Sequence, residues 1–154
     1  MLKYVNTKVV FSEVPDEITL VINISNCPYK CKGCHSPYLG TDIGEPLYPE
    51  ILERLIDNNK GITCVAFMGG DSDPDEIHRL AVTVKIIFPD LKVAWYSGKD
   101  TLHKRIKLNI IDFDYIKIGS YKEECGPLNS KTTNQRFYKV ENNTLIDITN
   151  KFWK

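Results

Sequence analysis

Short apolar runs recur along the chain, separated by polar and turn-forming residues. The runs are rich in β-branched and aromatic side chains. They predict four buried strands, at residues 18–24, 62–68, 91–96 and 113–118. Residues 36–48 contain two prolines and two glycines, and we expect them to form a loop.

Amphipathic segments alternate with these strands. Residues 49–58 start with proline and end before Asn-Lys-Gly, which predicts a helix. Residues 74–88 place apolar side chains on one face at helical spacing, and residues 102–108 predict a short helix. Strand–helix alternation predicts a parallel sheet with right-handed crossovers. Residues 137–140 and 145–148 predict a terminal β-hairpin.

The length of the chain limits the fold that it can form. Its 154 residues suit one domain with a hydrophobic core, and we expect residues 1–154 to form it. A complete eight-unit barrel typically needs about 250 residues. We therefore predict an α/β fold in which the parallel sheet forms a partial, open barrel followed by a C-terminal β-hairpin.

Composition and charge narrow the function. Lys and Arg together number 20, as do Asp and Glu, so no basic excess favours nucleic acid. No apolar run approaches the roughly 18 residues of a membrane-spanning helix. Residues 1–17 lack the hydrophobic region of a signal peptide. We expect a cytoplasmic protein with no nucleic-acid or membrane partner.

Three of the five cysteines lie close together, in the spacing C-x3-C-x2-C: Cys27, Cys31 and Cys34. Thiolates are the usual ligands of iron–sulfur clusters, and a cubane cluster has four irons. Three local thiolates therefore leave one iron with open positions for a small molecule. A Cys3His zinc site with His35 is an alternative, although adjacent Cys34 and His35 suit a tetrahedral ion poorly.

The other two cysteines have no such pattern around them. Cys64 lies in an apolar run and is expected to be a buried small hydrophobe. Cys125 lies in a polar loop and has no predicted role. A disulfide framework is disfavoured because clustered cysteines without a signal peptide do not indicate an extracellular protein.

Polar and glycine-rich segments follow each predicted strand. Because ligands of parallel α/β proteins bind beyond the carboxyl ends of strands, we expect these segments to meet at one mouth. They contribute the candidate cofactor-binding residues Asn26, Gly33, His35, Gly69, Gly70, Asp71, Ser97 and Lys117. Several have a simpler interpretation: Gly69-Gly70-Asp71 could form a turn, Lys117 could face solvent, and Asn26 and His35 could satisfy their own loop.

The cysteine loop resembles that of the radical S-adenosylmethionine (radical SAM) enzymes. In that family the open iron chelates the amino and carboxylate groups of the methionine part of SAM. Gly69-Gly70-Asp71 resembles the family's Gly-Gly-Glu motif, whose backbone carbonyl accepts a hydrogen bond from the SAM amino group. Asp71 replaces the commoner Glu, and Gly33 stands where many members carry an aromatic residue near adenine. A partial barrel is the fold that this resemblance implies.

Three segments resemble one subfamily more closely, the activases of anaerobic (class III) ribonucleotide reductase. They are the Cys-Pro-Tyr-x-Cys-x-Gly-Cys-His form of residues 27–35, the Trp-Tyr-Ser-Gly strand end at 95–98, and the Thr-Asn-Gln-Arg stretch within 126–138. The resemblance covers most of residues 18–140, whereas residues 1–17 depart from it.

This resemblance implies an activity, cofactors and partners. A [4Fe–4S] cluster held by the three clustered cysteines would cleave SAM reductively, and the resulting radical would take a hydrogen from a glycine of the reductase. No catalytic side chain is expected beyond the cluster and SAM. The implied partners are the anaerobic ribonucleoside-triphosphate reductase and a one-electron donor such as flavodoxin or ferredoxin. Alternatives are another small radical SAM enzyme, such as a different glycyl-radical activase or a deazaguanine synthase, and a non-catalytic metal-binding module.

Overall fold

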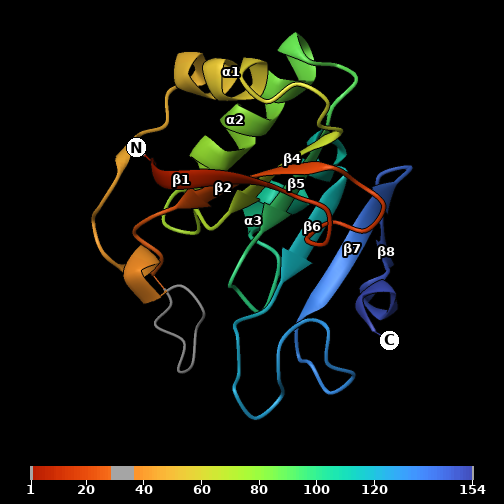
Figure 1. Cartoon of the computed structure of the whole chain (residues 1–154). Coiled ribbons are helices and arrows are strands. Elements are labelled where there is room, and N and C mark those ends of the chain that lie inside the picture. The colour runs from red at the N-terminus through yellow and green to blue at the C-terminus, as the bar shows by residue number, and fades with distance from the viewer. Residues whose placement is uncertain (1, 29–36, 154) are drawn as a thin grey trace.

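The computed structural model describes residues 2–28 and 37–153 (Figure 1). The strands of these residues form one sheet in the order β3-β1-β2-β4-β5-β6-β7-β8. Their bounds are β1 (Lys3–Val10), β2 (Thr19–Ile24), β3 (Glu45–Pro46), β4 (Cys64–Met68), β5 (Lys92–Tyr96), β6 (Tyr115–Ile118), β7 (Arg136–Glu141) and β8 (Thr144–Asp147). The helices are α1 (Pro49–Asp57), α2 (Pro74–Ile87) and α3 (Lys104–Lys107), with 3-10 turns η1 (Pro37–Gly40), η2 (Ile110–Asp112) and η3 (Thr149–Phe152).

The central strands have the predicted topology. β2, β4, β5 and β6 are parallel neighbours. β7 and β8 form the predicted hairpin, which pairs with β6 in antiparallel orientation. The prediction of an α/β fold is therefore confirmed. Over the described ranges the sheet is not closed, because β3 and β8 are its two edges; the assignment to a radical SAM barrel stays a prediction.

Two strands were not predicted. β1 pairs antiparallel with β2, with an irregularity between Tyr4 and Asn6, and β3 pairs with the start of β1. The sheet is therefore mixed. None of the helices in residues 2–28 and 37–153 is long and apolar enough to cross a membrane.

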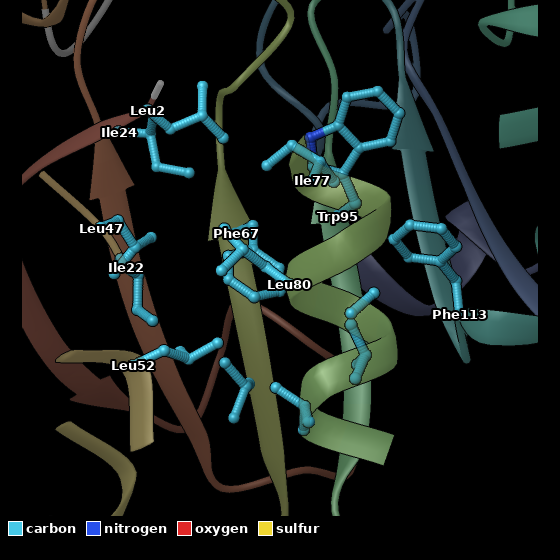
Figure 2. Packing of buried hydrophobic residues seen from close by; sticks show 14 of the residues in the cluster. Leu2, Ile22, Ile24, Leu47, Leu52, Phe67, Ile77, Leu80, Trp95 and Phe113 are labelled. Carbon is cyan, nitrogen blue, oxygen red and sulfur yellow. The ribbon is translucent and has the colours of Figure 1, made fainter. Parts of the chain in front are cut away.

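One face of the sheet is covered by α1 and α2 (Figure 1). Helix α2 begins at Pro74, and the Asp73 side chain caps it by accepting a hydrogen bond from the Glu76 N–H at 3.2 Å. The helix buries one apolar face against the sheet, with Ile77 and Trp95 at the same end of the cluster (Figure 2). The main core therefore lies between the helices and the sheet.

The opposite face carries no helix of comparable size among the described residues, and smaller side chains lie at its centre. Phe137 packs there against the rings of Tyr96, Tyr115 and Phe152, with ring centroids 5.0 to 5.7 Å apart. Val14, from the segment that joins β1 to β2, is fully buried in the same cluster. The joining segment and η3 thus cover this second face.

A buried carboxylate holds the amino ends of the parallel strands together. The Glu17 side chain accepts hydrogen bonds from Thr63 at 2.8 Å, Lys92 at 2.8 Å and Tyr115 at 2.9 Å. Burial acts to raise the pKa of Glu17, but these three donors outweigh it and hold that pKa below its ordinary value. This end of the sheet is stabilised by polar contacts and lies opposite the predicted mouth.

Candidate cluster and cofactor site at the carboxyl edge of the sheet

The loops that carry the predicted site residues follow the carboxyl ends of the parallel strands. Residues 25–28 follow β2, residues 69–73 follow β4, and residues 97–103 follow β5. The long segment 119–135 follows β6, and β7 returns from it into the sheet (Figure 1). Because the four strands are parallel neighbours, these segments leave the sheet at one common edge.

The chain turns sharply as it enters the cysteine loop. Asn26 has a positive φ of 59°, and its N–H donates to the Thr41 carbonyl at 3.2 Å. The Cys27 N–H donates to the Leu39 carbonyl at 2.8 Å, and the Asn26 amide donates to Asp42 at 3.0 Å. The returning segment therefore fixes half-buried Cys27 at the end of β2. The other predicted loop residues, Cys31, Gly33, Cys34 and His35, lie outside the described residues.

The two glycines after β4 have backbone conformations that residues with a side chain rarely adopt. Gly69 has φ +105° and Gly70 has φ +95°. The Trp95 indole N–H donates to the Gly69 carbonyl at 2.7 Å, and the Asp73 N–H donates to the Gly70 carbonyl at 3.0 Å. Each carbonyl keeps a second lone pair for a further donor. A Cβ atom on Gly70 would lie 2.5 Å from Cδ1 of Ile77, so the fold itself requires glycine there.

Asp71 and Ser97, both predicted site residues, contact each other directly. The Asp71 carboxylate accepts hydrogen bonds from the Ser97 hydroxyl at 2.5 Å and the Gly98 N–H at 2.9 Å, and it lies 2.9 Å from Nε2 of His103. The Asp71 side chain is only 1% exposed. The carboxylate thus joins the turn after β4 to the segment after β5. His103 was missed because nothing in the sequence links it to a residue 32 positions earlier.

Lys117 is buried, so the interpretation that it faces solvent is wrong. Only 8% of its surface is exposed, and its ammonium group donates to the Gly119 carbonyl at 2.8 Å and the Ser97 carbonyl at 3.2 Å. Side chains alternate along a strand, so Lys117 lies on the same face as Tyr115, the face away from α1 and α2. It places a cation beside the carboxyl ends of β5 and β6.

Backbone hydrogen bonds tie the edge loops to their neighbours. The Gly69 N–H donates to the Tyr96 carbonyl at 3.0 Å, and the Ser97 N–H donates to the Lys117 carbonyl at 2.8 Å. The Gly119 N–H donates to the Lys99 carbonyl at 2.7 Å. In the Thr-Asn-Gln-Arg stretch, the Asn134 amide donates to Ser120 and the Gln135 amide to Gly119. The site edge is therefore braced from β4 to β7.

The remaining thiols differ in their fitness as ligands. Cys64 is fully buried at the amino end of β4, and burial raises the pKa of its thiol well above the ordinary value. It is therefore a poor source of a thiolate and lies at the wrong end of the strand. Cys125 is half-buried in the segment after β6, on the site edge. Within residues 2–28 and 37–153, no three His, Cys, Asp or Glu side chains gather as a metal site.

Comparison with known proteins identifies the family. A family model described as "4Fe-4S single cluster domain" matches residues 18–140. The chain therefore belongs to this family, and the match runs from the residue before β2 into β7. Neither the curated proteins nor the solved structures gave a match. Membership supports the predicted iron–sulfur cofactor over a zinc site. The residues fit a cluster because Cys27 is held at the open edge and its two partner thiolates follow within the same short loop.

Proposed function

We propose that this protein is a radical SAM activase that generates a glycyl radical on an anaerobic (class III) ribonucleotide reductase. The observation that carries the proposal is the position of Cys27, the first of the three clustered cysteines. It follows β2 at the edge where the Gly69-Gly70 turn and the buried Lys117 ammonium also lie. This edge would then hold three kinds of group: a cluster with one open iron, two carbonyl acceptors and a cation. Together they suit an amino acid that is bound through its amine and its carboxylate.

Each group has a distinct part in binding. Cys27, Cys31 and Cys34 would hold the cluster, which when bound supplies one electron to the sulfonium of SAM. The Gly69 and Gly70 carbonyls have a lone pair each for the SAM amino group. The Lys117 ammonium attracts a carboxylate, and its low exposure strengthens that attraction. Asp71 and Ser97 are buried and would not contact SAM; their hydrogen bond joins the turn after β4 to the segment after β5.

The proposed substrate is a glycine presented by a large protein. The described sheet is open, so a loop of a partner can approach its carboxyl edge. The balanced charge offers no basic surface for a nucleotide polymer. The Cys-Pro-Tyr and Thr-Asn-Gln-Arg segments favour this activase over other radical SAM enzymes. In the structure, the latter stretch braces the end of β6.

The proposal is tested with the reduced, SAM-loaded protein and its reductase. Anaerobic reconstitution should give about four irons per chain. Mixing with the reductase should produce a doublet from a glycyl radical in the electron paramagnetic resonance spectrum. The doublet should disappear when the reductase's radical-bearing glycine is replaced by Ala, and when Cys27 is replaced by Ala.

Other outcomes identify the alternatives. Formation of 5′-deoxyadenosine without a protein radical would overturn the activase assignment in favour of a small-molecule enzyme such as a deazaguanine synthase. Four irons per chain without SAM cleavage would indicate a non-catalytic cluster module. Stoichiometric zinc without iron after anaerobic purification would refute the cluster itself.

A further inference from the structure

His103 contacts Asp71, which is part of the Gly69-Gly70-Asp71 turn, and Trp95, which is hydrogen-bonded to that turn. Its Nε2 lies 2.9 Å from the Asp71 carboxylate, and its ring packs against Trp95 with centroids 5.5 Å apart. The Trp95 indole N–H in turn donates to the Gly69 carbonyl at 2.7 Å. His103 therefore supports the turn after β4 in two ways: directly through the Asp71 carboxylate, and through Trp95 at the Gly69 carbonyl.

We infer that His103 is a positioning residue for SAM, an inference that rests on the proposed function. A buried carboxylate requires hydrogen-bond donors, and the Asp71 side chain is 1% exposed. Its donors are the Ser97 hydroxyl, the Gly98 N–H and the His103 ring. Loss of the His103 donor leaves this carboxylate under-satisfied, and the turn relaxes to regain a partner or water.

A small relaxation of the turn is enough to affect the ligand. The first lone pair of the Gly69 carbonyl is used by Trp95, so a SAM amine must use the second. The direction of that second lone pair is set by the Gly69–Gly70 peptide plane, which the positive φ of Gly70 and the indole hydrogen bond fix together. Misplacement of a binding group by about 1 Å can cost as much as a hundredfold in rate. His103 therefore acts on SAM without touching it.

The chain contains a matched control, His78 on α2. Its Nε2 lies 2.7 Å from the Asp112 carboxylate, and its ring contacts Phe113 with centroids 6.4 Å apart. The His78 and His103 side chains are each 16% exposed. His78, like His103, has a carboxylate and an aromatic partner, but they belong to η2 and the residue after it, and the Asp112 side chain is 31% exposed. Its replacement tests what loss of such a contact does to stability alone.

The experiment measures SAM affinity in four forms of the cluster-loaded protein. They are the wild type and the variants His103→Phe, His103→Gln and His78→Phe. Phe keeps a ring beside Trp95 but no donor, whereas Gln keeps a donor for Asp71 but no ring. Anaerobic equilibrium dialysis with labelled SAM gives the Kd, and iron content and Tm are measured on the same samples.

We expect His103→Phe to weaken SAM binding by about tenfold with its iron retained. His103→Gln should restore affinity to within about threefold of the wild type, and His78→Phe should bind SAM normally despite a lowered Tm. A second readout needs no SAM: hydrogen exchange of the Trp95 indole N–H should be faster in His103→Phe, with the Trp153 indole as internal reference.

The outcomes separate the two proposals. If the wild type binds no SAM, the proposed function is wrong. If the wild type binds SAM and His103→Phe binds it equally well, the positioning role alone is wrong. Equal loss of affinity in His78→Phe would also overturn it, because the effect would then follow from general stability. If hydrogen exchange of the Trp95 indole N–H is unchanged in both His103 variants, His103 does not support the turn. This readout holds even for a variant that is too unstable to be loaded with the cluster.

Discussion

Replacement of Gly70 by Ala should destabilise the protein through a specific clash with Ile77. Gly70 has φ +95°, and a side chain held in such a conformation costs about 1–3 kcal/mol. The new Cβ would lie 2.5 Å from Cδ1 and 2.7 Å from Cγ1 of Ile77, which is fully buried. Overpacking of this kind costs a further 1–3 kcal/mol or so. We therefore expect Gly70→Ala to lower the free energy of unfolding by about 2–6 kcal/mol in total.

A double-mutant cycle separates the clash from the backbone strain. Ile77→Ala removes both clashing atoms and alone costs about 2–5 kcal/mol. The double variant should lose less than the sum of the single variants, by roughly the 1–3 kcal/mol of the clash. Gly69→Ala is the control, since the nearest atom to its Cβ is the Ile24 carbonyl oxygen at 3.2 Å, and it should not couple to Ile77→Ala.

The assay is urea denaturation under anaerobic conditions, followed by circular dichroism and extrapolated to water. The clash would be refuted if the costs of Gly70→Ala and Ile77→Ala added up to the cost of the double variant to within about 0.5 kcal/mol. Confirmation would show that the fold needs Gly70 independently of any ligand. A Gly70 variant that loses SAM binding would then have to be compared with the Gly70→Ala, Ile77→Ala double variant, in which the clash is removed.

Three further predictions concern the two ends of the sheet. Glu17→Gln should lower the free energy of unfolding by about 1–3 kcal/mol at pH 7, because three donors lose a charged acceptor. Since the pKa of Glu17 is held below its ordinary value of 4.5, this stabilisation is present above pH 4.5 and is lost as the pH falls through the lower pKa. Urea titrations at several pH values should show the difference in unfolding free energy between the wild type and Glu17→Gln closing, and a constant difference would contradict the prediction. Cys64→Ala and Cys125→Ala should each retain about four irons per chain by iron and sulfide analysis, and a loss of one iron or more in either would show that it is a ligand. Lys117→Met should lower Tm, because the buried carbonyls of Ser97 and Gly119 lose a donor, and should also raise the Kd for SAM; unchanged values of both would refute its burial and its proposed role.

The central strands were predictable because their apolar runs are continuous, as buried parallel strands require. β1 was not predicted because Asn6, Thr7 and Lys8 interrupt its apolar residues and the strand is only partly buried. Its identity as a strand depends on pairing with β2, and that pairing is a tertiary contact.

The sequence could predict where the candidate residues lie in the fold, but not which contacts they make. Topology alone brings the strand ends together, so the edge that carries Cys27, Gly69, Ser97 and Lys117 could be expected. The burial of Lys117 could not, because alternation along β6 does not tell which segments cover each face. The contacts of His103 join residues distant in sequence and leave no periodic pattern.

The proposed function requires that SAM bind to the cluster through its amino acid part. Electron–nuclear double resonance on the reduced protein, with SAM labelled by 15N at the amino group, reports nuclei coordinated to the cluster. If SAM binds in this way, the spectrum shows a 15N hyperfine coupling that is absent with unlabelled SAM and absent in Cys34→Ala. A fully loaded [4Fe–4S] protein that shows no such coupling at saturating SAM would contradict the proposed function.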